Sequence, residues 1–348
     1  WSHGDLSIAA GDPTADPEGK FQDLHDYVQS LKAAPGHRVL AANRGERAKA
    51  LRVRLVADLA GANVAAKNRV PLDWTSRAGK LVSDAIDDGF ERLLIPSVEA
   101  KVRVDLSEEA DAEAIDVFAE NLRHLLLEPP LGADGVLGID PGYRTGCKVA
   151  AIGPTGDLLE HTVIYPTKPK EDLAGAAKTV LSILQKHDIR TVAVGNGTAS
   201  RETETFLRNL KKESGRDFTV VVVSESGASV YSASEVARDE FPQLDLTVRS
   251  AISIARRLQD PLAELVKVDP KSIGVGQYQH DVNQRQLKAG LDRVVESCVN
   301  RVGVDLSTAS HKLLEYVSGI SPRVAKSIVS TRETLGGFRS RADLKKVP

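Results

Sequence analysis

The chain has 348 residues, 41% of them hydrophobic, which is enough for two or more domains with buried cores. Its formal net charge of −2 excludes a global attraction to nucleic acid, so such binding would need a local basic patch. The chain has no signal-peptide pattern and no long uncharged apolar run, so we expect no membrane partner. Cys147 and Cys298 lack metal-binding spacing, and a reducing cytoplasm is the expected location.

The chain begins at Trp1 and contains no methionine, so we interpret it as an excised or partly ordered fragment.

The N-terminal third is expected to be a helical domain. Residues 1–18 are expected to form a loop or entry segment, and residues 19–130 a helical domain that ends at a Pro-Pro pair. Apolar residues at helical spacing support this prediction: Leu51, Leu55, Val56, Leu59, Ile115, Phe118 and Leu122.

Between residues 131 and 252 the pattern changes to strands separated by glycine-containing turns. The expected strands are 136–140, 148–152, 158–165, 191–195 and 219–223, with helices at 171–187 and about 200–212. Three antiparallel strands followed by helix–strand–helix–strand predict a mixed five-stranded sheet with helices on its faces. Residues 253–310 are expected to form a helical connector, and residues 311–348 a separate helical module.

Asp140 stands where the first of these strands ends. A carboxylate at the exit of a buried strand is costly unless a metal, a polar partner or phosphate-bound water compensates it. The alternative is a turn aspartate that caps the following loop through its own backbone. The residues alone leave both interpretations open.

Four phrases carry a resemblance to a known family: GIDPGYRTGCKVA (138–150), GNGTASRETE (195–204), VVSESGASVYSASE (222–235) and SIARRLQDPLAELVKVDPKSIGVGQYQHDVNQ (253–284). Together with the order of the elements, they resemble the YqgF branch of the ribonuclease H-like fold within the Tex family of bacterial transcription accessory proteins. The resemblance covers residues 19–348 and implies an α/β plus all-α fold. It implies a ribonuclease H-like sheet between an N-terminal helical region and a C-terminal helix-hairpin-helix.

In nucleases of this fold, a carboxylate cluster holds two metal ions. Asp140 matches the first acid of that cluster, and Asp260 is the candidate for the late-helix acid; as an alternative, Asp260 is an ordinary acid near a proline kink. The fourth strand is followed by Asn196, with no acid before Glu202. We therefore interpret Asp140 and Asp260 as remnants of a catalytic and metal site that would hold Mg²⁺ weakly. No cofactor is expected, although Mg²⁺ is possible.

Residues 313–332 resemble a helix-hairpin-helix, in which a glycine turn and the N–H groups of the second helix grip a nucleic-acid backbone. The module usually carries Gly-x-Gly, whereas Ser321 takes the third position here. Residues 311–348 contain eight Lys or Arg against three acids, which supplies the local basic patch. The alternative is a purely structural hairpin. The candidate nucleic-acid-binding residues are Gly319, Ile320, Ser321, Arg323, Lys326 and Arg332.

A second hairpin starts near residue 344, so the module is expected to be truncated. The C-terminal OB-type RNA-binding domain that usually accompanies this family is expected to be missing from the fragment. A further basic face at Arg44, Arg47, Lys49, Arg52 and Arg54 is typical of a solvated helix surface.

The preferred hypothesis is a non-sequence-specific nucleic-acid-binding accessory protein of transcription. It would bind RNA, DNA or both, and it could contact the transcription machinery. Its ribonuclease H-like domain would not cut, although enzymatic activity is left open. The main alternative is a Mg²⁺-dependent, structure-selective nuclease or resolvase that uses Asp140, Asp260 and a further acid such as Glu225 or Glu202. A third, an actin-like ATPase, is disfavoured because Gly195-Asn196-Gly197 lacks the second acid of a phosphate loop.

Overall fold

The computed structural model describes residues 4–306 and 309–348. The chain forms two compact units, Trp1–Phe118 with Gly276–Leu287, and Ala119–Val275 with Lys288–Pro348. Two long helices, α4 (Ile95–Leu126) and α11 (Gln284–Val302), contain boundaries between the units. Each unit therefore includes parts that are distant in sequence.

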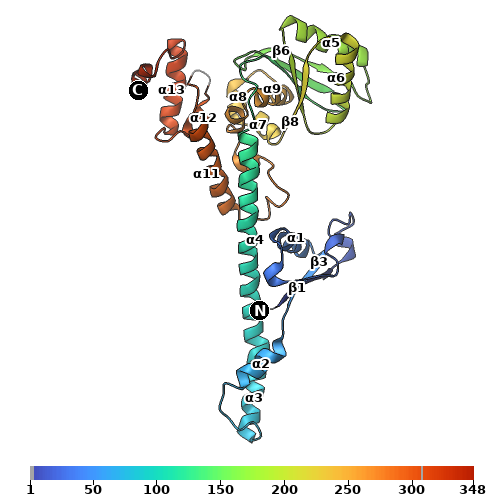
Figure 1. The fold of residues 1–348 in the computed structure, drawn as a ribbon, viewed down its shortest axis with the longest axis vertical. Coiled ribbons are helices and arrows are strands. Elements are labelled where there is room, and N and C mark those ends of the chain that lie inside the picture. Colours follow the sequence, from blue (N-terminus) through green and yellow to red (C-terminus); the bar gives the residue numbers. More distant parts are fainter. Residues whose placement is uncertain (1–3, 307–308) are drawn as a thin grey trace. The chain divides into compact units, whose positions relative to one another are not determined.

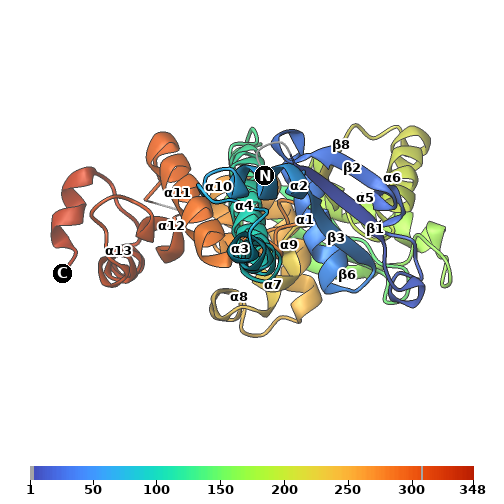
Figure 2. The same ribbon diagram turned by 90° about the horizontal axis from the view of Figure 1, so that it is seen from below.

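The first unit contains a three-stranded antiparallel sheet in the order β2-β1-β3, with strands Tyr27–Ser30, Asp5–Ala10 and Leu51–Val56 (Figures 1 and 2). The prediction that residues 1–18 form a loop is therefore wrong, and so is the all-helical interpretation of 19–130. In β3, Leu51 and Val53 are buried while Arg52 and Arg54 are exposed. This two-residue period marks a strand, but the apolar positions of β3 also fit helical spacing.

Helices complete the first unit. α1 (Gly36–Arg47) packs against β3 and buries Val39, Leu40 and Ala42. The other elements of this unit before α4 are η1 (Pro13–Ala15), η2 (Gln22–Leu24), η3 (Leu31–Ala33), α2 (Leu59–Lys67), α3 (Arg77–Gly89) and the π-helical turn η4 (Phe90–Leu94). The N-terminal third is thus a mixed α/β unit.

The second unit contains a five-stranded sheet in the order β6-β5-β4-β7-β8. The strands are β4 (Val136–Asp140), β5 (Cys147–Ile152), β6 (Leu158–Ile164), β7 (Thr191–Gly195) and β8 (Thr219–Val223). β4, β5 and β6 pair antiparallel, whereas β4 pairs with β7 and β7 with β8 in parallel. This is the predicted mixed sheet, and its topology is ribonuclease H-like.

Helices cover both faces of this sheet (Figure 1). α5 (Leu173–Lys186) and α6 (Ser200–Ser214) bury Val180 and Leu207 against one face, while α9 (Leu246–Gln259) buries Ile252 against the other. Gly138 allows the close approach of α9, because a Cβ there would lie 2.3 Å from the carbonyl oxygen of Ala251. The sheet domain therefore continues to residue 259, beyond the predicted boundary at 252.

The remaining elements of the second unit are helical. They are α7 (Ala228–Ala233), α8 (Glu235–Glu240), α10 (Pro261–Leu265), η5 (Pro270–Ser272), α12 (His311–Glu315), α13 (Pro322–Leu335) and η6 (Arg341–Lys346). In the described part of the chain, every helix is too short or too polar to cross a membrane.

Candidate functional site

The carboxyl ends of β4 and β7 mark the point where the chain changes direction through the sheet. From β4 the chain turns to its antiparallel neighbour β5, and from β7 it passes through α6 to β8 on the other side. Ligands of open α/β sheets bind in the crevice at such a switch point. We call this region the carboxylate crevice and define it by Asp140, Asn196, Gly197, Glu225 and Ser250.

Asp140 lies at this edge, as predicted, and is half-buried. Its carboxylate is hydrogen-bonded by Ser250 of α9. Burial raises the pKa of the Asp140 carboxyl, and the Ser250 hydrogen bond and the charge of Lys148 oppose the rise only in part. The carboxylate therefore has one polar partner within the fold.

Glu225 follows β8 and supplies the second acid of the crevice. Its carboxylate accepts a hydrogen bond from the Gly197 amide, and its own amide donates to Asn196 Oδ1 at 3.0 Å. A Cβ at Gly197 would lie 1.7 Å from Glu225 Oε1, so any larger residue there would force the Glu225 carboxylate to move. Burial, and then the charge of Asp140, raise the pKa of Glu225. The sequence offered Glu225 only as one possible further acid, but the two glycines around Asn196 create the space for its side chain.

Arg257 of α9 fixes the loop that carries Glu225. Its Nη1 donates to the carbonyl oxygens of Ser224 and Ser226, at 2.8 and 2.7 Å. The side chain is buried, and its Nε and Nη2 atoms have no hydrogen-bond partner in the described structure. Burial lowers the pKa of this guanidinium despite nearby acids, foremost Glu264 and Glu225. The carbonyl groups of the two residues that flank Glu225 are thus held by one buried cation.

Asp260 does not join this crevice. Its side chain caps α10 by accepting the Ala263 amide at 2.9 Å, and it is exposed. Asp260 directly follows the C-terminal end of α9. This end of the helix lies near the start of β4, because the carbonyl oxygen of Leu258 accepts a hydrogen bond from the amide of Leu131, five residues before β4 begins. Ser250, which contacts Asp140, lies in the N-terminal half of α9, ten residues before Asp260, and ten helical residues span about 15 Å. The structure therefore separates the two acids that the sequence paired as a catalytic and metal site.

The crevice does not fit a two-metal centre. Among residues 4–306 and 309–348, no group of three or more His, Cys, Asp or Glu side chains could hold a metal ion. Glu202, the other acid considered from the sequence, accepts a hydrogen bond from Tyr143 at 2.9 Å. Asn196 Oδ1 already accepts the Glu225 amide. Two acids and an engaged amide are fewer ligands than paired cations require.

The predicted hairpin is formed by α12, the turn around Gly319 and α13. Gly319 has a φ of +86°, in the left-handed region that glycine adopts at no steric cost. Ser321 caps α13, because its Oγ accepts the Val324 amide at 3.3 Å. Gly319 and Ser321 are exposed and Ile320 is half-buried. Ser321 thus serves as a helix cap at the position where the usual module has glycine.

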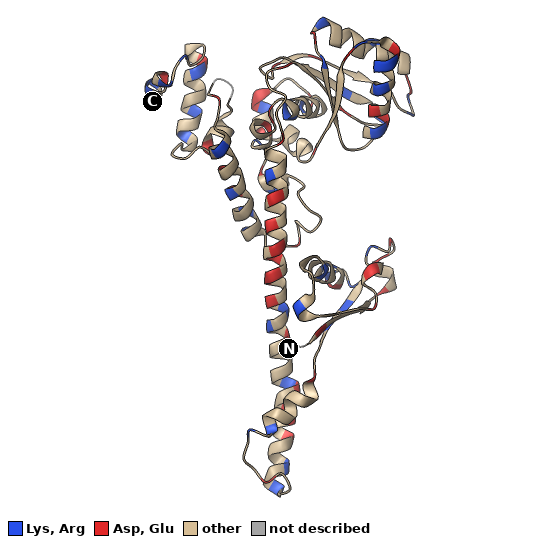
Figure 3. Cartoon of the chain, viewed as in Figure 1, with Lys and Arg blue, Asp and Glu red and all other residues tan. Residues whose placement is uncertain are grey.

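α13 carries several basic residues, coloured blue in Figure 3, and they differ in what they contact. Arg323 and Lys326 are exposed, and neither side chain makes a hydrogen bond or ion pair within the described residues. Arg332 instead donates to the carbonyl oxygens of Leu306 and Ala309, at 3.1 and 2.8 Å. The sequence grouped all three as nucleic-acid-binding residues. The structure leaves Arg323 and Lys326 available to a phosphate and gives Arg332 a structural contact.

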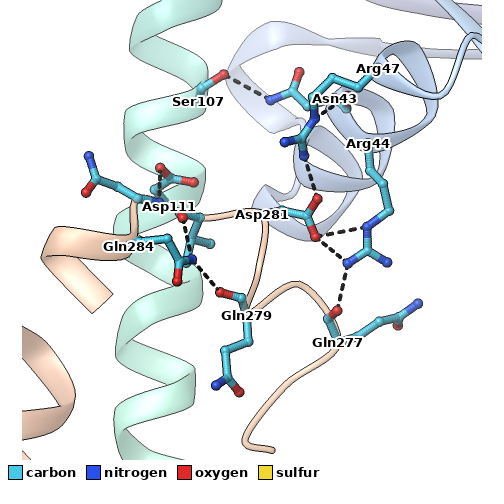
Figure 4. Close-up of polar contacts among 11 residues, drawn as sticks. Asn43, Arg44, Arg47, Ser107, Asp111, Gln277, Gln279, Asp281 and Gln284 are labelled. Atoms are coloured by element: carbon cyan, nitrogen blue, oxygen red, sulfur yellow. Dashed lines mark hydrogen bonds and ion pairs between the residues drawn. The ribbon is translucent and has the colours of Figure 1, made fainter. Parts of the chain in front are cut away.

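Two arginines of the N-terminal basic face are engaged within the first unit (Figure 4). Arg44 and Arg47 both pair with Asp281, and Arg44 also donates to the Gln277 carbonyl oxygen at 2.8 Å. The Arg44 guanidinium lies 4.5 Å from the centre of the Tyr278 ring. Both arginines attach the segment 276–287 to α1, in place of the solvated surface that the sequence suggested.

Comparison with known proteins identifies all three regions. Residues 1–118 match the family model "Tex central region-like", residues 134–259 "Tex protein YqgF-like domain" and residues 299–348 "Helix-hairpin-helix motif". The "Protein tex" of Bordetella pertussis is 47% identical over 363 residues, which cover 100% of this chain and 46% of that protein. The "Transcriptional accessory protein Tex" of Neisseria gonorrhoeae is 42% identical over 100% of this chain and 46% of its own length.

The solved RuvC structure from Thermus thermophilus is also similar to this chain. The match covers 38% of this chain and 95% of the RuvC chain, at 17% identity and a TM-score of 0.27. The chain spans about half the length of the curated relatives it matches. The three family models match successive parts of the chain, two of them are models of Tex regions, and the two Tex relatives align with 100% of the chain. The chain therefore belongs to the Tex family.

Proposed function

We propose that this chain binds nucleic acid through the sugar-phosphate backbone, without reading base sequence, as part of a transcription accessory protein. The α12–α13 hairpin carries the proposal. Gly319 leaves the turn open, and no atom lies within 4 Å of where its Cβ would be. Arg323 and Lys326 stand exposed beside the N-terminus of α13, where N–H groups and the helix dipole favour an anion. A phosphate is the anion that every nucleic-acid sequence presents.

The relatives support the setting of this activity. One is named as a transcriptional accessory protein, and we extend that role to this chain. Both cysteines are free and buried, which suits a reducing, cytoplasmic location. RNA and DNA share the phosphate contacts, so the hairpin alone gives no preference between them. The transcription machinery is the proposed protein partner.

We further propose that the ribonuclease H-like domain holds nucleic acid without cutting it. Asn196 occupies the position where the fourth strand would supply an acid, and Asp260 caps α10 away from Asp140. The nuclease alternative rests on the proximity of the Asp140 and Glu225 carboxylates, which interact electrostatically. Incubation with structured DNA and RNA in Mg²⁺ or Mn²⁺ tests it. Cleavage that Asp140→Asn abolishes would replace our proposal with the nuclease.

Fluorescence anisotropy with labelled nucleic acids of unrelated sequence tests the binding proposal. We expect equal affinities for three unrelated duplexes and a loss of at least tenfold in the double variant Arg323→Glu/Lys326→Glu. The matched control is Lys178→Glu/Arg238→Glu, which makes the same charge change at exposed sites on α5 and α8. An equal loss in both variants would mean that only total charge matters, and no loss in either would refute the role of the hairpin.

A further inference from the structure

A cavity of about 540 Å³ lies beside the carboxylate crevice, within the second unit. Three segments form its walls: the β4–β5 loop with Tyr143, the β6–α5 loop with Lys168, and the first turns of α6 with Arg201. A neighbouring hollow of about 440 Å³ shares Tyr143 and Arg201 and reaches Asn196 at the end of β7. The two hollows meet at Tyr143 and extend from the switch point of the sheet along α6.

The cavity offers an aromatic surface and an apolar wall. Phe206, buried in the sheet core, and Leu173 supply apolar groups. Tyr143 is 39% exposed as a residue and lines both hollows, so its side chain is accessible to a ligand. Its hydroxyl donates to Glu202 Oε1 at 2.9 Å, and this hydrogen bond holds the ring in place before any ligand arrives. A fixed, exposed aromatic ring is a platform on which a nucleobase can stack.

The cavity is also lined by the acids Glu171 and Glu202, of which Glu202 is bonded to Tyr143, but three other polar side chains are free to contact a ligand. The side chains of Lys168, Arg201 and Asn209 make no hydrogen bond or ion pair with any described residue. An amide such as that of Asn209 offers a donor and an acceptor in the geometry of a base edge. Lys168 and Arg201 can neutralise phosphates on either side of that base. Aromatic ring, amide and two cations together match one nucleotide of an extended strand.

We propose that this cavity binds an unpaired nucleotide of a single-stranded nucleic acid, with its base stacked on Tyr143. The base edge meets Asn209, and the flanking phosphates meet Lys168 and Arg201. A paired base cannot enter, because its edge and both faces are covered in a duplex. The inference rests on the proposed nucleic-acid binding and deepens it. The hairpin would grip the backbone of any strand, whereas this cavity would add affinity only where a base is free.

The test compares a single strand carrying one 2-aminopurine with the blunt duplex of the same sequence, using the full chain. In the wild type we expect quenching of the 2-aminopurine fluorescence in the single strand. Tyr143→Ala should lose this quenching and weaken single-strand binding roughly 5- to 150-fold, the range for loss of one stacked base. Duplex affinity should stay within twofold. Tyr143→Phe keeps the ring without its hydroxyl and should retain at least half of the quenching.

Arg201→Gln should also weaken single-strand binding, and Arg208→Gln is its matched control on the same helix. Arg208 is exposed and pairs with Glu204, and it does not line the cavity. Unchanged single-strand affinity in Tyr143→Ala, or an equal loss for duplex and single strand, would overturn the inference while leaving the hairpin proposal intact. If the wild type binds neither probe, the proposed function itself fails. RNA and DNA versions of the single strand show which sugar the cavity accepts.

Discussion

The carboxylate crevice and the α12–α13 hairpin each carry charged residues that the sequence marked as candidates, yet they differ in what those residues contact. In the crevice, the carboxylate of Asp140 is hydrogen-bonded by Ser250, and that of Glu225 accepts a hydrogen bond from the Gly197 amide. Arg257 holds the loop between β8 and α7. In the hairpin, Arg323 and Lys326 have no partner within the described residues. The side chains that the fold leaves without a polar partner are therefore the stronger candidates for contact with a charged ligand.

The strongest test of this contrast on the crevice side is Arg257→Met. The substitution keeps an unbranched apolar side chain but removes the donor to two partly buried carbonyl groups, next to the acids Glu225 and Glu264. We expect the free energy of unfolding to fall by about 3 kcal/mol, as when one member of a buried ionic group is removed. Urea denaturation measures the change. Arg238→Met, at an exposed site, is the control, and equal stability of the two variants would contradict the structural role of Arg257.

Arg332→Gln tests the division within the hairpin. Loss of the guanidinium leaves the carbonyl groups of Leu306 and Ala309 without this donor. We expect the free energy of unfolding to fall by roughly 1–2 kcal/mol. Affinity for a duplex should fall much less than in Lys326→Glu. An unchanged stability with a large loss of affinity would return Arg332 to the set of phosphate contacts that the sequence predicted.

Asp140→Asn should have the smallest effect, a modest increase in stability at neutral pH. Burial raises the pKa of both carboxyls, and the charge of Asp140 raises the pKa of Glu225 further, so the folded state binds protons more readily than the unfolded state. The ionised carboxylates destabilise the folded state at neutral pH. This destabilisation disappears as the pH falls through the pKa values of the two groups in the folded state and they become protonated. The advantage of the variant over wild type should therefore shrink at acid pH. A variant less stable than wild type at pH 7 would show that the Ser250 hydrogen bond outweighs burial.

Much of the fold was predictable because its signals are local. Glycine turns and β-branched runs marked all five strands of the larger sheet, and the Gly319 turn with Pro322 marked the hairpin. The small sheet was missed where two periods overlap, in Leu51–Val56. Residues 1–18 contain two Asp-Pro pairs, at 12–13 and 16–17, which indicate turns and obscure the apolar alternation of Leu6 and Ile8 in β1, both of which are buried.

The candidate site was less predictable because it depends on long-range contacts. Asp140 could be identified from its place at the end of a strand. That Glu225 lies near Asp140 can be predicted only if one knows that β8 ends beside β7 and that Gly197 leaves space for the Glu225 side chain. Asp260 was misplaced because the sequence does not show that α9 runs from the Asp140 end of β4 back to its start. Arg332 resembles Lys326 in sequence, and only its carbonyl partners distinguish the two.

The salt dependence of duplex binding tests the central claim most directly. If Arg323 and Lys326 each contact a phosphate, the slope of log affinity against log salt should become shallower by about 1.8 in Arg323→Glu/Lys326→Glu, since each phosphate contact contributes roughly 0.9. The Lys178→Glu/Arg238→Glu control should keep the wild-type slope. An unchanged slope in the hairpin variant would show that its exposed cations do not hold nucleic acid.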